Sequence, residues 1–542
     1  MKPVILVVLD GYGLAPPGPG NAIDIANPKC LKNLAKEFPS TTLAASGAAV
    51  GLPYNEVGNT EVGHLNIGAG RVVAQSLPRI NTSIADGSFY ENGALLGAVS
   101  HVKKNRSKLH IIGLIGEHRV HSSLDHLYAL LYFCKEFSVD NVFLHIITDG
   151  RDSPPKSASL FIKPLEELMK RLELGKIAGI MGRYYAMDRD LHWERIEKAY
   201  SCLTYGVGNK ARSWREAIES SYNRGLSDEF IVPTNIIDNK PILVEDHDAV
   251  VFFNYRIDRP RELTKAFVLD DFENKANIVS FDPYETKYYK SHLRKITSVP
   301  KPFKREKKLK DLYFATMTEY EKGLEVHVAF PPHIIKETLG EVISCNNLKQ
   351  LRVSESEKER FVTIYFSGLH ENAFKGEDRM NIPSLRVSTY DLAPSMSAPG
   401  ITEAVVASLS QKKHQFILVN FANADMVGHT GNLKATVEAV KTLDKCVNEI
   451  VEVALLHDWT ILITGDHGNA EEMINSKTHE VDTEHSSNPV PFIAVDNNYK
   501  NKKMKLKPGI LADIAPTVLA NLGINKPDVM TGESLLPSTP RG

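Results

Sequence analysis

The feature that most constrains the fold of this chain is a series of short, continuous apolar runs that end in polar residues. The clearest of these runs are Val4–Leu9, His110–Leu114, Val142–Ile147, Lys176–Met181, Ala249–Phe253, Phe416–Asn420, Thr460–Thr464 and Pro491–Val495. Helix-length amphipathic segments lie between them. Continuous rather than alternating apolar residues are typical of strands that are buried on both faces of a parallel sheet. The sequence therefore predicts an α/β fold.

The polar residues after these runs differ between the middle of the chain and its two ends. They are Asp and His near both termini, but Arg between residues 110 and 260. A chain of 542 residues is also too long for one hydrophobic core. We therefore predict that residues 1–76 and 311–542 form a discontinuous metal-binding domain, into which an α/β substrate domain of residues 77–310 is inserted. We interpret the basic stretch Pro300–Lys310 as a surface linker at the second junction.

Composition restricts the partners and the location of the protein. A net charge of -2 gives no reason to expect nucleic acid or an anionic membrane as a partner. No apolar run approaches the roughly 20 residues that cross a bilayer. The five cysteines are scattered without metal-binding or disulfide spacing, as expected of thiols in a reducing compartment. We expect a cytoplasmic monomer that acts on a small molecule.

The candidate metal ligands are Asp and His residues at or just after strand-like runs. Asp425 and His429 are four residues apart, so a helix would place both side chains on one face. Mixed carboxylate and imidazole ligands suit Mn²⁺ or Zn²⁺, whereas Mg²⁺ prefers oxygen ligands. The set indicates a two-metal site for phosphoryl transfer, and its members are Asp10, Asp425, His429, Asp466, His467 and His485.

A hydroxyl residue, Thr60, lies in a loop between Gly58 and Gly63. A threonine in such a loop is ordinarily a turn or cap residue. The flanking glycines, however, would let the backbone approach a phosphate closely. Because a metal-bound hydroxyl loses its proton more readily, Thr60 is a candidate nucleophile.

Five arginines follow the strand-like runs in the middle of the chain. A single surface arginine is usually only solvated, but a guanidinium group binds carboxylate and phosphate through two parallel hydrogen bonds. A cluster of them therefore favours a small substrate that carries several negative charges. The five residues are Arg151, Arg183, Arg189, Arg256 and Arg259.

Five motifs resemble those of the cofactor-independent phosphoglycerate mutases, which belong to the alkaline phosphatase superfamily. They are Gly58–Arg71, Asp149–Ser153, Gly182–Asp190, Gly428–Gly431 and Gly465–Glu471. The resemblance implies an inserted domain, a phosphoenzyme intermediate and no bisphosphoglycerate cofactor. It also implies two divalent metal ions, Mn²⁺ before the alternatives Mg²⁺, Co²⁺ and Zn²⁺. One metal would be held by Asp425, His429 and His485, and the other by Asp10, Thr60, Asp466 and His467.

The resemblance also implies a substrate site and roles for several of its residues. His121, Asp152 and Lys358 would join the five arginines in binding phosphoglycerate. Lys358 would neutralise charge on the transferred phosphoryl group, and we assign Asp152 as the acid and base that serves the glycerate hydroxyls.

The chain departs from the family at Thr60, where the family has serine. The added methyl group restricts the χ1 angle and crowds the attacking oxygen, so we expect a slower enzyme. Two alternatives stay open from the residues alone. One is a metal-dependent phosphatase or phosphodiesterase on the same core, and the other is a binding protein without turnover.

Overall fold

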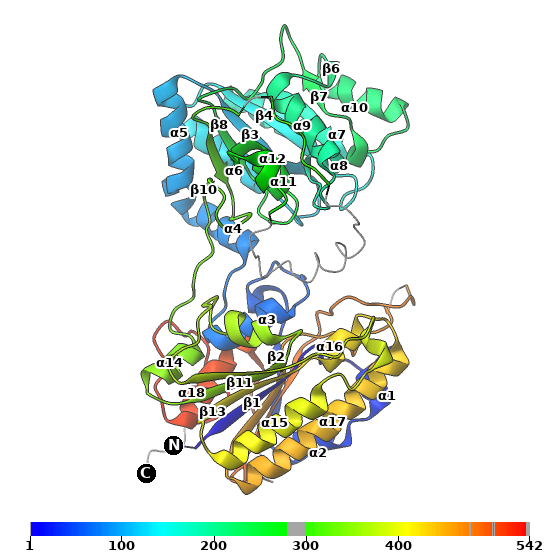
Figure 1. The fold of residues 1–542 in the computed structure, drawn as a ribbon, viewed down its shortest axis with the longest axis vertical. Coiled ribbons are helices and arrows are strands. Elements are labelled where there is room, and N and C mark those ends of the chain that lie inside the picture. Colours follow the sequence, from blue (N-terminus) through cyan, green and yellow to red (C-terminus); the bar gives the residue numbers. More distant parts are fainter. Residues whose placement is uncertain are drawn as a thin grey trace. The chain divides into compact units, whose positions relative to one another are not determined.

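The computed structural model of the chain describes residues 2–278, 300–306, 308–475, 478–500, 502 and 504–537. It divides into two compact units (Figure 1). Unit 1 comprises Met1–Pro78 and His333–Gly542, and unit 2 comprises Arg79–Pro332. Each unit has its own eight-stranded sheet with helices on both faces. No helix in the described ranges is long and apolar enough to cross a membrane.

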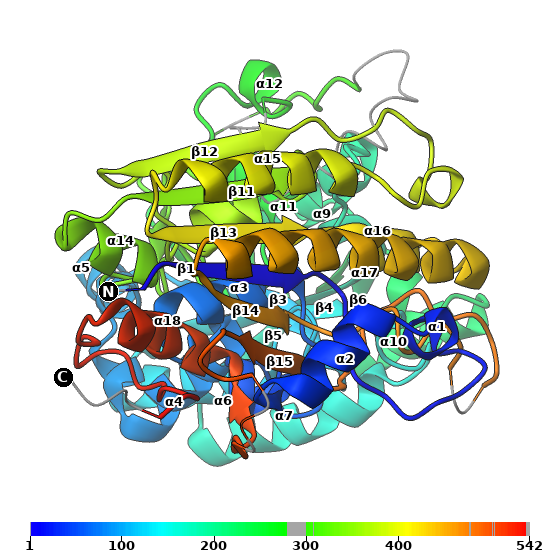
Figure 2. The same ribbon diagram turned by 90° about the horizontal axis from the view of Figure 1, so that it is seen from below.

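The sheet of unit 1 is built from both ends of the chain, and its strand order from β12 to β15 can be followed in Figure 2. The central strand β1 runs parallel to β13 on one side and β14 on the other, with Val4 opposite Phe416 and Thr460. In spatial order the strands are β12 (Glu377–Ile382), β11 (Gln350–Glu355), β13 (Phe416–Phe421), β1 (Val4–Leu9), β14 (Thr460–Gly465), β15 (Val490–Val495), β2 (Ser40–Ala44) and β16 (Gly509–Ile510).

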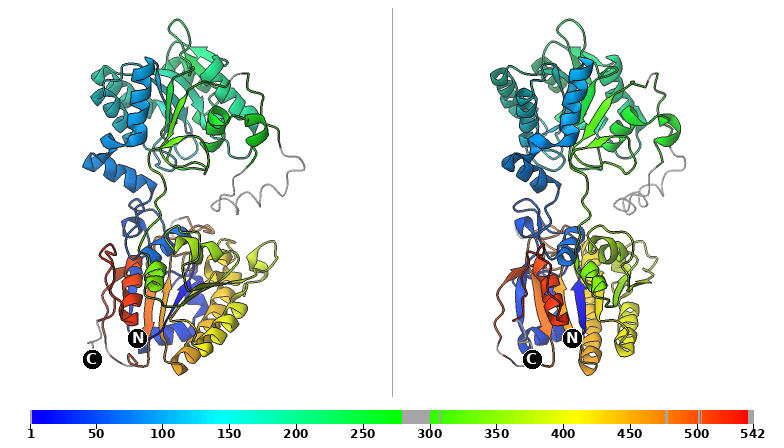
Figure 3. Two further views of the ribbon diagram at one scale, coloured as in Figure 1. Left: turned by 60° about the vertical axis from the view of Figure 1, so that its left-hand side comes forward. Right: turned by 90° about the vertical axis from the view of Figure 1, so that its left-hand side faces the viewer.

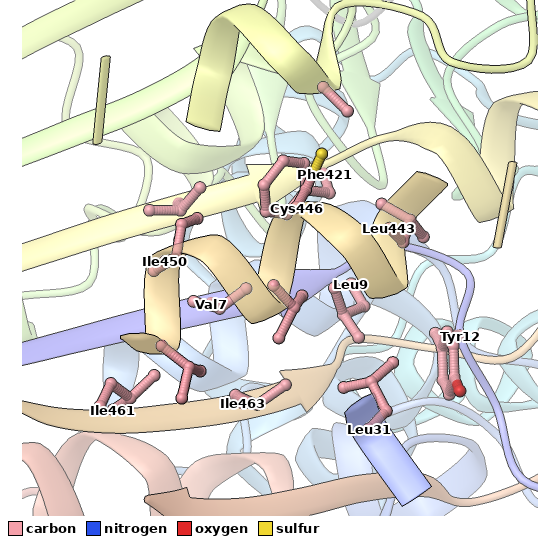
Figure 4. Packing of buried hydrophobic residues seen from close by; sticks show 14 of the residues in the cluster. Val7, Leu9, Tyr12, Leu31, Phe421, Leu443, Cys446, Ile450, Ile461 and Ile463 are labelled. Carbon is pink, nitrogen blue, oxygen red and sulfur yellow. The ribbon is translucent and has the colours of Figure 1, made fainter. Parts of the chain in front are cut away.

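Two helical layers cover this sheet because successive residues of each strand point to opposite faces. Val7 and Leu9 of β1 pack against one layer, where Leu443 and Ile450 of α17 lie over them (Figure 4). That layer consists of α1 (Ala22–Ala26), α2 (Lys29–Glu37), α15 (Ala398–Gln411) and α17 (Leu433–Leu456). The other layer consists of α3 (Thr60–Ala69), α14 (Leu339–Cys345) and α18 (Ile514–Leu522). Every residue of β1 is fully buried, which explains its continuous apolar sequence.

Unit 2 has a second, mainly parallel sheet. Its strands, in spatial order, are β10 (His327–Val328), β9 (Tyr313–Thr316), β8 (Ala249–Phe252), β3 (Leu109–Ile115), β4 (Val142–Thr148), β5 (Lys176–Gly182), β7 (Thr234–Ile236) and β6 (Asn209–Ala211). The helices of this unit appear in blue to green in Figure 3. They are α4 (Ser76–Asp86, which begins in unit 1), α5 (Gly93–Asn105), α6 (Leu124–Glu136), α7 (Ala158–Leu172), α8 (Arg183–Ala186), α9 (Trp193–Tyr205), α10 (Trp214–Asn223), α11 (Arg261–Val268) and α12 (Phe272–Lys275).

The predicted α/β class and the two-domain organisation are confirmed, but three details differ from the prediction. Strand β15 runs antiparallel to β14 rather than parallel to it. The second junction lies after Pro332 rather than at residue 310, because β9 and β10 complete the sheet of unit 2. The described part of Pro300–Lys310 is also not a solvated linker, since Phe303 and Leu309 are buried in the core of unit 2.

Candidate active site

The strand ends of unit 1 bring the predicted metal ligands to one edge of the sheet. Asp10 follows β1, Asp466 follows β14, and Asp425 lies in α16 (Asn423–Gly428) after β13. These three strands are parallel neighbours, so their carboxyl ends meet at that edge. His485 reaches the same edge because it precedes β15, whose antiparallel direction places its beginning beside the end of β14.

Thr60 is the first residue of α3, and the side chain of Asn59 caps this helix by accepting a hydrogen bond from the Val62 N–H. The Thr60 side chain is buried against the ligand set. Its Oγ1 lies 3.0 Å from Asp10 Oδ1 and 3.0 Å from His467 Nε2. The amino end of a helix favours negative charge, so this position suits a hydroxyl that is to carry a phosphate.

The candidate ligands form two overlapping groups. We call these ligands, together with Thr60, the metal cluster. Ligand atoms of Asp10, Asp466 and His467 lie within 4.8 Å of one another, and so do those of Asp425, His467 and His485. His429 Nε2 lies 3.1 Å from Asp425 Oδ1 and 3.0 Å from His485 Nε2. The structure thus gathers every predicted ligand, and it places His467 in both groups rather than in one.

The donor atoms fit divalent cations. Among the described residues, Asp466 Oδ2 is a buried carboxylate oxygen that accepts no hydrogen bond, and its nearest polar contact is His64 Nδ1 at 3.2 Å. An unsatisfied buried carboxylate oxygen is costly unless a cation binds it. The close approach of His429 Nε2 to His485 Nε2 likewise places two imidazole nitrogens where one ion could take both.

Lys358 lies inside the metal cluster rather than with the arginines. It follows β11, whose carboxyl end is at the same sheet edge. Its buried Nζ is 2.7 Å from Asp10 Oδ1, 2.8 Å from Thr60 Oγ1 and 2.6 Å from Asp425 Oδ2. Burial alone would lower the pKa of Lys358, but the Asp10 and Asp425 carboxylates raise it above its usual value. Lys358 is therefore a fixed positive charge beside the candidate nucleophile.

Carboxylates also raise the proton affinity of the histidines in this cluster. Burial lowers the pKa of His467, but Asp466, Asp10 and Asp425 outweigh it and raise that pKa to about 10. The pKa of His429 is raised in the same way, mainly by Asp425, against the opposing effect of burial. A metal ion that binds here must displace protons from these rings.

Two residues beside the metal cluster were not among the predicted site residues. His64 lies one turn after Thr60, with Nδ1 3.0 Å from the Thr60 carbonyl oxygen and 3.2 Å from Asp466 Oδ2. Asn420 donates a hydrogen bond of 2.8 Å to Asp10 Oδ2, and its Nδ2 is 3.1 Å from His64 Nε2. The i, i+4 spacing from Thr60 could have indicated His64, whereas nothing in the sequence distinguishes Asn420 as a partner of Asp10.

The glycines that flank Thr60 have a packing role in addition to the predicted one. A Cβ atom on Gly58 would lie 2.0 Å from the Ala45 carbonyl oxygen, and one on Gly63 would lie 2.7 Å from the Asp466 carbonyl oxygen. Gly63 thus allows α3 to pack closely against the loop that carries Asp466, and Gly58 allows the segment before α3 to pass close to Ala45.

Unit 2 carries the second group of predicted site residues, centred on Arg183. Its Nη1 is 2.5 Å from both Asp149 Oδ1 and Asp152 Oδ2, and its Nη2 is 3.0 Å from His121 Nε2. Burial lowers the pKa of His121 to about 3, with Arg183 adding to the effect and Asp258 opposing it. The ring is therefore neutral, and Arg183 donates to its Nε2.

The other arginines of unit 2 surround this centre. Arg189 Nη1 is 2.7 Å from Asp258 Oδ2, and Arg256 Nε is 3.2 Å from Asp258 Oδ1. Arg259 donates to the Met187 carbonyl oxygen, and burial followed by repulsion from neighbouring arginines lowers its pKa to about 10. Arg151 is about half exposed, and its Nη1 lies 3.9 Å from Glu229 Oε1. We call these five arginines with His121 and Asp152 the arginine cluster.

Comparisons with known proteins agree with this arrangement. A family described as the BPG-independent PGAM N-terminus matches residues 80–322. A protein of Chloroflexus aurantiacus named 2,3-bisphosphoglycerate-independent phosphoglycerate mutase is 46% identical over 99% of this chain and 98% of its own length. One of Moorella thermoacetica with the same name is also 46% identical, with the same coverage of both chains.

A solved structure shows the same fold. The phosphoglycerate mutase of Leishmania mexicana, determined at low cobalt concentration, has a TM-score of 0.62 and 26% sequence identity to this chain. The match covers 99% of this chain and 98% of the other. Both units are therefore included in the likeness.

Proposed function

The chain belongs to the family of 2,3-bisphosphoglycerate-independent phosphoglycerate mutases, and we propose that it works through a phosphoenzyme formed on Thr60. The observation that carries the proposal is the surroundings of Thr60 Oγ1. It lies at the amino end of α3, within 3.0 Å of Asp10, His467 and Lys358. A buried hydroxyl with carboxylate, imidazole and ammonium partners fits a nucleophile that receives a phosphoryl group.

Two divalent metal ions would occupy the metal cluster. Asp10, Asp466 and His467 would hold one with Thr60, and Asp425, His429 and His485 would hold the other. Bound there, the ions would lower the pKa of the hydroxyl and neutralise phosphate charge. We propose Mn²⁺ as the ion because the ligands mix carboxylate with imidazole, and Co²⁺, Zn²⁺ and Mg²⁺ are the competitors to test.

In the first half-reaction, Thr60 Oγ1, having lost its proton to solvent, forms a bond to phosphorus while the bond from phosphorus to the 3-oxygen of glycerate breaks. Lys358 stays protonated and balances negative charge on the phosphoryl oxygens. Asp152, which takes up a proton from solvent before this step, supplies the proton that the 3-oxygen gains. In the second half, the 2-hydroxyl returns a proton to Asp152 while its oxygen takes the phosphoryl group from Thr60. The free Thr60 oxygen and the Asp152 carboxyl group are thus regenerated in each cycle.

The arginine cluster would bind the glycerate portion of the substrate. The guanidinium groups of Arg256 and Arg189 both contact the Asp258 carboxylate, which holds two positive charges side by side where a substrate carboxylate would bind. Asp152 lies beside Arg183, which holds the pKa of Asp152 low against the effect of burial. The carboxylate form is the one needed to take a proton from the 2-hydroxyl.

The test is to incubate the protein with 3-phosphoglycerate and Mn²⁺, without bisphosphoglycerate, and to measure 2-phosphoglycerate and free phosphate in parallel. We expect isomer without phosphate release, together with a phosphorylated peptide containing Thr60 in quenched samples. The matched variant Thr60→Ser should be faster, since it removes the crowding methyl group. Phosphate release alone would instead make the protein a phosphatase, and equal rates for both proteins would remove the proposed effect of the methyl group.

Location and assembly are part of the proposal. We propose that the enzyme works as a cytoplasmic monomer on a small-molecule substrate. Light scattering on the purified protein tests the monomer, and fractionation of the source cells tests the location.

A further inference from the structure

Glu471 is a buried carboxylate that contacts three separate loops of unit 1. Its Oε2 accepts hydrogen bonds from the backbone N–H of Gly13 at 3.0 Å and of Asn469 at 2.9 Å. Its Oε1 accepts from the Ser486 hydroxyl and from Asn488 Nδ2, the latter at 3.1 Å. Four donors therefore converge on one side chain. An ionised carboxylate can accept all four, whereas an amide would turn its own N–H groups toward two of them.

Each of these loops carries candidate metal ligands. The donor on the first loop lies three residues after Asp10, the donor on the second lies two residues after His467, and Ser486 directly follows His485. The first two ligands belong to one proposed metal and His485 to the other. Glu471 therefore contacts loops that carry ligands of both proposed metals, although it is not itself a ligand.

A fourth ligand is reached through Asn469. The backbone of Asn469 is held by Glu471, and its side-chain Nδ2 lies 3.3 Å from Asp425 Oδ1. The fit is close, since a Cβ atom on Gly428 would lie 2.4 Å from Asn469 Oδ1. Asp425 is thus linked to the same carboxylate by one intermediate residue.

The surrounding glycines are required by the position of this carboxylate. A Cβ atom on Gly13 would lie 2.3 Å from Glu471 Cδ, and one on Gly468 would lie 2.3 Å from Glu471 Oε1. Contacts of that length do not occur without displacement of one partner. The two loops therefore close directly onto the carboxylate, with no room for a side chain between them.

We propose that Glu471 is a positioning residue shared by both metal sites, so that its loss weakens metal binding at the two sites together. The inference rests on the proposed two-metal site. Groups that orient metal ligands without binding the ion typically contribute 10–100-fold to metal affinity. A residue that serves ligands of both ions should affect both affinities, whereas a partner of a single ligand should affect one.

The experiment compares wild type with Glu471→Gln, and uses Glu472→Gln as the matched control. Glu472 is the next residue, undergoes the same chemical change, and contacts only Asn488 among these donors. Mn²⁺ titration followed by electron paramagnetic resonance measures both dissociation constants. The visible spectrum of the Co²⁺-loaded proteins reports ligand geometry at saturation. The unfolding temperature in chelator reports stability without metal.

We expect Glu471→Gln to weaken both Mn²⁺ sites by 10–100-fold and to change the Co²⁺ spectrum, while Glu472→Gln stays within about twofold of wild type. A purely structural role would lower the unfolding temperature but leave the dissociation constants and the spectrum unchanged, and this result would overturn the proposal. Weakening of one site only would also overturn it.

A second variant covers the case in which Glu471→Gln does not fold. Gly13→Ala displaces the same carboxylate from the opposite side, so it should weaken both sites as well. Normal affinities in Gly13→Ala would contradict the inference. If wild type itself bound no Mn²⁺ in this cluster, the proposed function would fail rather than the role of Glu471.

Discussion

The histidines of the two units respond to burial in opposite ways. Burial lowers the pKa of the six histidines compared here, but in the metal cluster of unit 1 nearby carboxylates reverse the effect for His429 and His467. In unit 2, burial of four histidines outweighs the neighbouring carboxylates, although Asp248 lies beside His110 and Asp258 beside His121. Their pKa values fall to about 3 for His121 and about 4 for His126, and they are lowered for His110 and His145 as well.

This contrast supports the ligands that we propose for each unit. Unit 1 concentrates Asp10, Asp425 and Asp466 around a single buried lysine, an arrangement that attracts further cations. Unit 2 gathers arginines beside neutral histidine, which leaves positive charge for an anion. Under the proposed function, histidine would serve metal ligation in unit 1 and anion binding in unit 2, and neighbouring charges would decide which.

The variant of unit 1 with the largest expected effect is Thr60→Ala. Loss of the attacking oxygen should reduce mutase turnover by about four orders of magnitude, because the phosphoenzyme cannot form. Turnover is measured as 2-phosphoglycerate production, and Mn²⁺ titration is the control, since the carboxylate and imidazole ligands remain. Turnover within tenfold of wild type would show that Thr60 is not the nucleophile.

The corresponding test in unit 2 is Asp152→Asn. Turnover should fall by roughly 10²–10⁴-fold, the usual contribution of a general acid and base, while KM changes little because the arginines remain. Steady-state kinetics in both directions measures the effect. The exposed Asp125→Asn is the control for removal of a negative charge from unit 2. A rise in KM without loss of turnover would make Asp152 a binding residue instead.

Metal removal should lower the stability of unit 1 more than that of unit 2. An ion at a hundredfold excess over its dissociation constant stabilises the folded state by about 2.7 kcal/mol per site. Chelation should therefore increase amide hydrogen exchange in the β1 and β14 peptides, with little change in β3 and β4. Equal increases in both units would mean that the ions are not confined to the unit 1 cluster.

Acidification should have the smaller effect, and it should act on unit 2. The pKa of His126 is about 4 in the folded protein and 6.5 when unperturbed, so unfolding binds a proton between these values. Its contribution to stability is complete above pH 6.5 and is lost as the pH falls toward 4, by up to about 1.4 kcal/mol per pH unit.

The measurement is denaturant unfolding of the Trp459→Phe variant, in which the fluorescent residues Trp193 and Trp214 both report on unit 2. Adding the His126→Gln substitution to this variant should reduce the pH dependence of its unfolding free energy between pH 6.5 and 4, because glutamine does not titrate. An unchanged pH dependence would show that other groups account for it.

Much of the fold could be predicted because the buried parallel strands have continuous apolar sequences. The runs expected at Val4–Leu9 and Thr460–Thr464 are β1 and most of β14, with the polar residues at their ends. The junction could not be predicted, since Pro300–Lys310 has the composition of a linker. Two apolar side chains, Phe303 and Leu309, nevertheless anchor that stretch in the core of unit 2.

The sequence by itself determined which residue types stand at the strand ends, and hence the metal ligands and the anionic class of substrate that we propose. Only the tertiary structure decided that Lys358 is buried between two carboxylates and that Glu471 contacts three loops. The reason is physical. Hydrophobic periodicity is a local property of the chain, whereas charge pairing and hydrogen bonding join residues hundreds of positions apart.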